Sequence, residues 1–193
     1  MRLLHLDSSA LGANSVTREL SAAIVARWQD AVPGLGVDYR DFDTNPLPHL
    51  TGGALAGTDA AAKAEGDAAM DQFLASDVIV MGAPMYNFGI PSTLKAWIDR
   101  IAVAGKTFRY TDKGPEGLAT GKRVIVASGR GGIYGESNAA DFQEAYLRHV
   151  FGFLGITDVE FVRAEGIAYS PQHRTDALAA AHASIREPMR EAA

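Results

Sequence analysis

Hydroxyl side chains gather in the segment Ser8 to Thr17, which reads Ser-Ser-Ala-Leu-Gly-Ala-Asn-Ser-Val-Thr. Hydroxyls add hydrogen-bond donors without net charge, and the first amides of a following helix add more donors and a partial positive charge. This combination suits a phosphate group. Neither Gly-Lys-Ser/Thr nor Gly-x-Gly-x-x-Gly is present, so a monophosphate is favoured over a nucleoside triphosphate or a tightly bound dinucleotide. The alternative is that Ser15 only caps the helix.

Aromatic and amide side chains gather in a second segment, Gly82 to Ser92, which reads Gly-Ala-Pro-Met-Tyr-Asn-Phe-Gly-Ile-Pro-Ser. A planar, polar-rimmed ring needs apolar surface for its face and a few amides or carbonyls for its rim. Asn87 could hydrogen-bond the N5/O4 side of a flavin. The alternative is a hydrophobic loop that only packs on its neighbour.

Glycines dominate a third segment, Ser128 to Gly135, with four glycines among its last seven residues. Glycine lets the backbone approach a ligand closely, so exposed amides here could meet the pyrimidine carbonyls of a flavin. Taken alone, the segment is more typical of a flexible turn than of a ligand site, and its position beside the other two segments is what favours a site. Together, the three segments suit one molecule with a phosphate at one end and a flat ring at the other, and FMN has this form.

Short apolar runs alternate along the chain with longer segments of helical spacing. The expected strands are residues 3–6, 37–42, 77–82, 122–128 and 159–162. The expected helices are residues 15–31, the second half of 53–75, 92–104, 142–154 and 175–189. This alternation predicts a single α/β domain over residues 1–193, with a doubly wound five-stranded parallel sheet and helices on both faces. Such sheets bind ligands beyond the carboxyl ends of their strands, where the three segments lie.

The composition of the chain argues against several classes of function. The chain has 193 residues, a formal net charge of −5 and no cysteine. The acidic balance argues against nucleic acid as a partner, and the lack of thiols excludes disulfides and Cys-ligated metals or clusters. The five histidines show no metal-ligand spacing, so no metal site is expected. No apolar run reaches the roughly 18 residues of a membrane span, and no signal peptide is recognised at the N-terminus. We expect a cytoplasmic protein.

Several longer runs resemble the FMN-dependent NADH-azoreductases, within the wider flavodoxin-like quinone reductases. The runs that carry the resemblance are residues 83–88 (Ala-Pro-Met-Tyr-Asn-Phe), 91–100 (Pro-Ser-Thr-Leu-Lys-Ala-Trp-Ile-Asp-Arg), 105–111, 114–118, 130–133, 153–158 and 164–169. The resemblance covers almost the whole chain. It implies a flavodoxin-like fold and a homodimer with one FMN per subunit and an active site at the interface.

The resemblance also assigns site residues. It implies that the phosphate is held by Ser9, Ser15, Val16 and Thr17. It implies that the isoalloxazine is held by Met85, Tyr86, Asn87, Phe88, Gly129, Arg130, Gly131 and Gly132, and that Tyr110 and Phe153 line the substrate pocket. One position departs from the pattern: Gly129, preceded by Ser128, stands where the family pattern has Ser or Thr, so a backbone N–H would have to serve there in place of a side-chain hydroxyl.

The expected activity is ping-pong hydride transfer from NADH or NADPH, through flavin N5, to azo dyes or quinones. The cofactor carries the chemistry and the protein supplies orientation, so no side-chain nucleophile is required. Residues 106–120, with Phe108 and Tyr110, look like a hairpin that overhangs the ring; an inert surface hairpin is the alternative. Asp99 and Arg100 could pair across a dimer interface or form a surface ion pair.

Two other classes of protein remain open. A flavodoxin-type electron carrier would bind FMN without turning over a small substrate, but such carriers are usually shorter and more acidic. A flavin-free nucleotide-binding or signalling domain is the second. The sequence ranks neither azo dyes against quinones nor NADH against NADPH.

Overall fold

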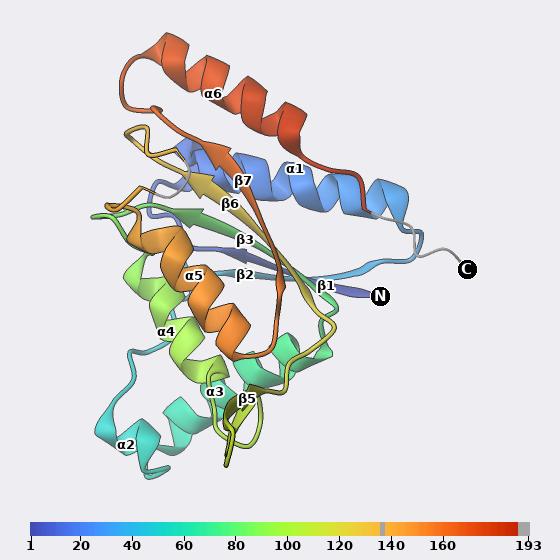
Figure 1. Cartoon of the computed structure of the whole chain (residues 1–193), viewed down its shortest axis with the longest axis vertical. Coiled ribbons are helices and arrows are strands. Elements are labelled where there is room, and N and C mark those ends of the chain that lie inside the picture. Colours follow the sequence, from blue (N-terminus) through green and yellow to red (C-terminus); the bar gives the residue numbers. More distant parts are fainter. Residues whose placement is uncertain (136–137, 189–193) are drawn as a thin grey trace.

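The computed structural model describes residues 1–135 and 138–188 and is built on one parallel sheet (Figure 1). Its strands lie in the order β2-β1-β3-β6-β7, and all neighbours are parallel. They span β1 (Arg2–Asp7), β2 (Gly36–Asp41), β3 (Val78–Pro84), β6 (Arg123–Gly129) and β7 (Asp158–Ala164). The expected doubly wound α/β sheet is therefore confirmed. Strand order reverses between β1 and β3, which creates the crevice where such folds bind ligands.

Helices cover both faces of the sheet (Figure 1). One face carries α1 (Val16–Ala31) and α6 (Pro171–Ser184), and the other carries α3 (Ala60–Ala75), α4 (Ser92–Ile101) and α5 (Phe142–Phe153). Each layer buries its own apolar cluster, with Leu20 and Ile24 in the first and Trp97 and Phe151 in the second. Because both faces are covered, β3 is buried at all seven positions, as central parallel strands are.

Two helices differ most from their predicted limits. The closing helix begins at Pro171 rather than Thr175, because the Ser170 side chain caps it by accepting from the His173 amide. It ends at Ser184, and Met189 lies outside the described residues. Ala181 is its one buried residue among those described, so apolar spacing could not mark its start. The segment 53–75 divides into a short α2 (Gly52–Leu55) and α3, with Gly57 in a left-handed conformation between them.

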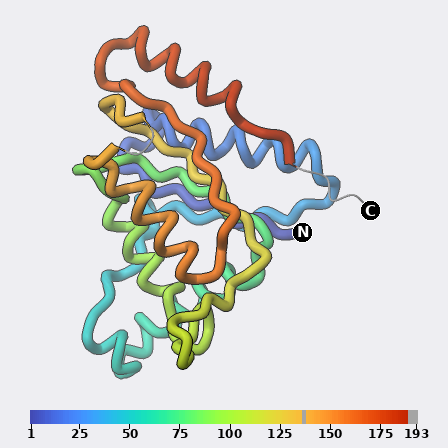
Figure 2. Tube along the Cα trace, in the orientation of Figure 1, coloured from blue at the N-terminus to red at the C-terminus, as the bar shows by residue number. Residues whose placement is uncertain are grey.

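An antiparallel hairpin stands outside the main sheet. It consists of β4 (Phe108–Thr111) and β5 (Gly114–Gly117). Figures 1 and 2 place it beside the C-terminal ends of α4 and α5, away from the carboxyl ends of the sheet strands. A Cβ atom on Gly117 would lie 2.1 Å from the Gly155 amide nitrogen, so backbone packs on backbone here. The amide of Ala119 also donates to the carbonyl of Leu154. The hairpin is thus fixed to the end of α5.

Candidate functional site

The three segments predicted from sequence lie together at the carboxyl end of the sheet, after β1, β3 and β6. The Ser9 hydroxyl lies 3.3 Å from the Tyr86 hydroxyl, which joins the first segment to the second. The Met85 amide donates to the Gly129 carbonyl at 2.9 Å, which joins the second to the third. Contacts between neighbouring strand ends therefore hold the three segments against one another.

The first segment provides donors without a cation. Ser9, Ser15 and Thr17 are all buried. Ser15 caps α1, because its hydroxyl accepts a hydrogen bond from the Arg18 amide at 3.3 Å. The capping role that the sequence offered as an alternative is therefore present. The amides of Val16 and Thr17, the first of the helix, have no hydrogen-bond partner within residues 1–135 and 138–188. Unpaired amides and buried hydroxyls at a helix N-terminus form an anion-binding arrangement.

The second segment ends in a tight, strained turn. Tyr86 and Gly89 exchange two backbone hydrogen bonds of 3.0 Å each. The two residues between them, Asn87 (φ 49°) and Phe88 (φ 69°), both adopt left-handed conformations. A bulky aromatic residue rarely does so, and such strain concentrates at ligand sites. The turn leaves Phe88 51% exposed, with its ring 6.5 Å from the ring of Tyr134 in the third segment.

In the third segment, glycine amides are available to a ligand in the crevice, whereas Arg130 is not. The Arg130 side chain is fully buried and forms ion pairs with Asp141 (2.8 Å), Glu144 (2.5 Å) and Glu165 (3.1 Å). Its amide donates to the Ala164 carbonyl. The guanidinium and the backbone amide of Arg130 thus both have partners away from the crevice. The structure therefore does not bring Arg130 to the crevice as the resemblance implies. The amides of Gly131 and Gly132, by contrast, have no partner in the described part of the chain.

Tyr110 and Phe153 do not join the three segments either. The Phe108 ring lies 5.5 Å from the Tyr110 ring and 4.5 Å from the Phe153 ring, so the three form a separate aromatic cluster. Phe153 ends α5, whose first residue, Phe142, follows the Asp141 partner of Arg130. At 1.5 Å per residue the helix spans roughly 17 Å between them. The hairpin therefore does not overhang the crevice of its own chain, contrary to the prediction, because it packs at the opposite end of α4 and α5 (Figure 1).

A buried polar network behind the first segment was missed by sequence reasoning. Asp7, the last residue of β1, accepts from Ser21 (2.9 Å) and from Tyr39 (3.1 Å). His5 lies 2.9 Å from the Ser21 hydroxyl, and burial lowers its pKa while Asp7 opposes the shift. Burial, with the nearby Asp7, raises the pKa of Tyr39 to about 12. The pattern that marked β1 as an apolar strand gave no sign that its polar residues meet α1 and β2.

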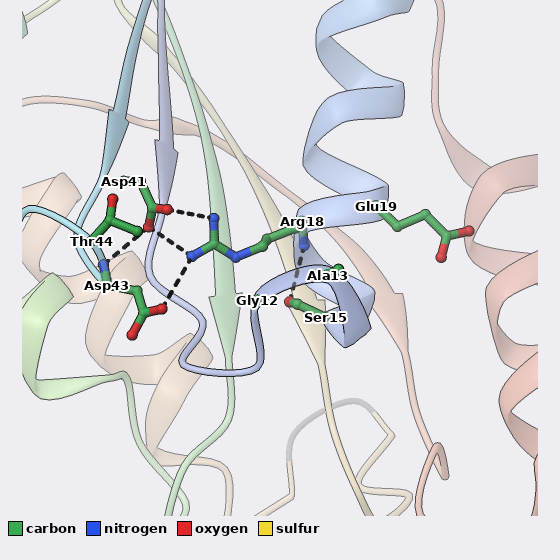
Figure 3. A pocket seen from close by; sticks show the side chains of 8 residues that line it. All are labelled: Gly12, Ala13, Ser15, Arg18, Glu19, Asp41, Asp43 and Thr44. Atoms are coloured by element: carbon green, nitrogen blue, oxygen red, sulfur yellow. Dashed lines mark hydrogen bonds and ion pairs between the residues drawn. The ribbon is translucent and has the colours of Figure 1, made fainter.

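Arg18 continues this network toward the crevice (Figure 3). It forms a bidentate pair with Asp41 at the end of β2, at 2.7 and 2.9 Å. This hydrogen-bonded pair raises the pKa of Arg18 further above its ordinary value. Burial alone would raise the pKa of Asp41, but the contacts with Arg18, the Asp43 amide and Thr44 together lower it. An arginine in the first turn of a helix and an aspartate ending a strand were the available signals, but only the fold shows that they meet.

Asp99 and Arg100 do not pair with each other. Asp99 accepts from Lys95 at 2.5 Å on the same helix. Arg100 is buried and donates to the carbonyls of Pro48 (3.0 Å) and His49 (3.4 Å). It therefore fixes the loop before α2 on α4, instead of forming the surface ion pair that was one alternative.

The described residues contain no cluster of three His, Cys, Asp or Glu side chains placed to hold a metal ion. Nor, within the same ranges, does any helix have the length and apolar character needed to cross a bilayer.

The fold and the crevice define a flavodoxin-like α/β protein with a site for a phosphorylated planar ligand. The family model described as a flavodoxin-like fold matches residues 1–188. The chain is 66% identical over 185 residues to an FMN-dependent NADH:quinone oxidoreductase of Stenotrophomonas maltophilia, which covers 96% of this chain and 94% of the relative. It is 67% identical over 187 residues to FMN-dependent NADH:quinone oxidoreductase 1 of Xanthomonas euvesicatoria, covering 97% and 96%.

Solved structures of other proteins show the same fold. An azoreductase from Bacillus anthracis is 31% identical and superimposes with a TM-score of 0.86, covering 96% of each chain. The chain belongs to the flavodoxin-like family of quinone and azo reductases, which confirms the resemblance seen in the sequence.

Proposed function

We propose that the chain is an FMN-dependent NADH oxidoreductase that reduces quinones and azo compounds, working as a homodimer. The observation that carries the proposal is the junction of three segments at the switch point, through the Ser9–Tyr86 and Met85–Gly129 contacts. The names of the relatives give the activity class: NADH:quinone oxidoreductase at 66% identity and azoreductase at 31%.

The residues present fit FMN at both of its ends. The hydroxyls of Ser9 and Ser15 and the free amides of Val16 and Thr17 would hold the phosphate. Met85 to Phe88 would support the isoalloxazine, and the amides of Gly131 and Gly132 would meet its pyrimidine carbonyls. Bound FMN would supply two-electron chemistry, taking hydride from a reduced nicotinamide and passing it to the substrate.

The chain's own residues would orient this chemistry. The strained turn defines the backbone conformation at Asn87 and Phe88, and donors that are preorganised in this way need no rearrangement during reaction. An aromatic face beside the ring suits flat substrates such as quinones. No acid or base among the described crevice residues is needed to explain transfer of hydride.

A second copy would complete the site. An exposed apolar surface lies beside the second segment, where Ile90, Phe142 and Tyr146 line a cavity of about 630 Å³. Phe142 is 64% exposed there, and exposed apolar surface of this kind marks an interaction site. The aromatic hairpin points away from its own crevice, so in the proposed homodimer Tyr110 and Phe153 of one copy line the substrate pocket of the other.

Initial rates test the proposal. We expect the purified protein to carry bound FMN and to oxidise NADH when a naphthoquinone or an azo dye is supplied. Because nicotinamide and substrate would use the same open face in turn, double-reciprocal plots should give parallel lines. FMN binding without turnover above that of free FMN would instead identify an electron carrier, and a colourless protein that takes up no FMN would overturn the proposal.

Two finer points complete the proposal. The reductant is NADH, as in the names of the relatives, and the ratio of kcat/KM for NADH and NADPH measures that preference. NADH is an intracellular metabolite, which supports a cytoplasmic location; fractionation of the source cells tests it.

A further inference from the structure

We infer that Arg18 is a positioning residue for the phosphate site, acting through the backbone of Ser9 and not through its own charge. Its guanidinium donates to the Ser9 carbonyl at 2.9 Å while Asp41 holds it from the other side. The inference rests on the proposed binding of the FMN phosphate at the Ser9–Thr17 segment.

The hydrogen-bond geometry of Arg18 shows why it does not contact a phosphate directly. One terminal nitrogen donates to Asp41 and to Tyr39, and the other donates to Asp41 and to Ser9. Each terminal nitrogen has two protons, so all four are in use. The remaining Nε is buried, without a partner in the described chain. Arg18 therefore has no exposed donor left to offer a ligand.

Local charge leads to the same conclusion. Beside the first segment lies a cavity of about 480 Å³ whose wall includes Arg18 together with Glu19, Asp41 and Asp43 (Figure 3). One cation faces three carboxylates, and Asp7 lies 3.7 Å from the guanidinium on its buried side. Ser15 lines the same cavity, but on the Arg18 side these carboxylates oppose a phosphate, so Arg18 does not attract the anion by its charge.

What Arg18 does fix is the direction of a peptide group. The peptide between Ser9 and Ala10 is planar and trans, so its carbonyl and its amide point in opposite directions. Arg18 holds the carbonyl, and the Ala10 amide accordingly points at the Tyr86 hydroxyl, 3.2 Å away. The Ser9 hydroxyl lies beside the same Tyr86 group at 3.3 Å. Through one peptide, Arg18 orients a backbone donor toward the junction of the first two segments.

A comparison of FMN with riboflavin tests the inference, because the two ligands differ only in the phosphate. Kd values for both should be measured by fluorescence titration of the flavin-free full chain. Arg18→Ala should weaken FMN binding roughly ten- to hundredfold, the range of a lost hydrogen bond to a charged group. Riboflavin binding should change less than about twofold on the same scale. Arg27→Ala removes an arginine from the same helix and serves as the matched control, changing neither Kd.

Asp41→Asn separates the two possible roles. It removes a negative charge near the site and weakens the clamp on Arg18. If Arg18 positions the Ser9 peptide, FMN binding weakens; if Arg18 attracts the phosphate by charge, FMN binding tightens, which would overturn the inference. Arg18→Lys keeps the charge but cannot make the bidentate pair, so we expect it to behave like Arg18→Ala. Retention of FMN affinity in Arg18→Lys would also overturn it.

The wild-type protein distinguishes failure of the inference from failure of the proposed function. Equal wild-type affinities for FMN and riboflavin would remove the phosphate site and the inference with it. A wild-type preference for FMN that survives in Arg18→Ala would leave the phosphate site standing and overturn the inference alone.

Discussion

A Cβ atom placed on Gly129 would lie 2.9 Å from Cγ2 of Thr17. The end of β6, where the glycine-rich segment begins, therefore packs directly on the first turn of α1. This contact gives a steric reason for glycine at position 129, because the Thr17 methyl group occupies the space that a side chain would need. It also couples the two ends of the proposed cofactor site, because Thr17 belongs to the phosphate end and Gly129 to the glycine-rich segment at the ring end.

Substitution of Gly129 by Ala should therefore destabilise the fold, and a smaller residue at 17 should restore it. Gly129→Ala forces a methyl against Thr17 and should cost about 1–3 kcal/mol of unfolding free energy, as overpacked cores do. Thr17→Ser keeps the hydroxyl and removes the opposing methyl. We expect Gly129→Ala/Thr17→Ser to regain most of the loss in urea denaturation.

The double-mutant cycle gives this prediction its control. Thr17→Ser alone should change stability much less than Gly129→Ala, since only one methyl group is lost. Purely additive effects of the two substitutions would show that the methyl contact is not the cause of the loss.

Arg130 should be a stability residue and not a ligand-binding one. Its fully buried side chain pairs with three carboxylates, and of these Glu144 also pairs with Arg163. Arg130→Ala removes the buried cation from Asp141 and Glu165 and should therefore cost about 3–5 kcal/mol. Arg130→Lys keeps the charge but not the fork geometry, and we expect only partial recovery. Chemical denaturation measures both variants. Loss of FMN affinity in Arg130→Lys with unchanged stability would mean instead that Arg130 contacts the cofactor.

Stability should fall as the pH drops below about 6.5, because of His5. Burial lowers the pKa of folded His5 below its ordinary value of 6.5, so in acid the unfolded chain binds a proton that the folded chain does not. Asp7, Arg18 and Tyr39 face this ring, and the first opposes the shift. Full stability is present above pH 6.5 and is lost as the pH falls toward the folded pKa.

Melting temperature as a function of pH measures this effect, and His5→Gln should flatten the acid limb. The His5 ring resonances, assigned by their loss in the variant, should titrate with a midpoint below 6.5. A midpoint above 6.5 would show that Asp7 wins over burial and would reverse the predicted slope.

The sheet and the crevice could be predicted because they depend on local patterns. Apolar runs such as 77–82 identify buried strands, and parallel strands place their following loops at one edge of the sheet. The order of the strands then requires the three segments to be neighbours. Predicted limits differ by a few residues where a cap decides them, as Ser170 does for α6.

Contacts between distant segments could not be predicted in the same way. The Arg18–Asp41 pair joins residues 23 positions apart, and nothing in either local sequence identifies its partner. The place of the hairpin depends on Gly117 meeting Gly155, a backbone contact without a sequence pattern. Arg130 sits within a glycine-rich segment typical of ligand loops, yet its burial is set by carboxylates on α5 and after β7.

The hairpin position predicts that mixed dimers of two inactive variants recover activity. Ser15→Asp preserves the helix cap but places a carboxylate at the proposed phosphate site, so it should abolish FMN binding. Tyr110→Ala removes a side chain that is 76% exposed, so it should fold and bind FMN but lose quinone turnover. If the hairpin serves the partner's crevice, a mixed dimer contains one site with intact segments and an intact hairpin.

Co-expression of differently tagged chains, followed by two-step purification, isolates these mixed dimers. Random assembly without purification should give about a quarter of wild-type turnover, since half of the dimers are mixed and each has one complete site. Inactive mixed dimers would show that each chain uses its own hairpin, because then neither site is complete. Active mixed dimers would mean that the aromatic cluster of Phe108, Tyr110 and Phe153 serves the crevice of the partner subunit. This arrangement agrees with the single chain, in which the cluster lies away from its own crevice.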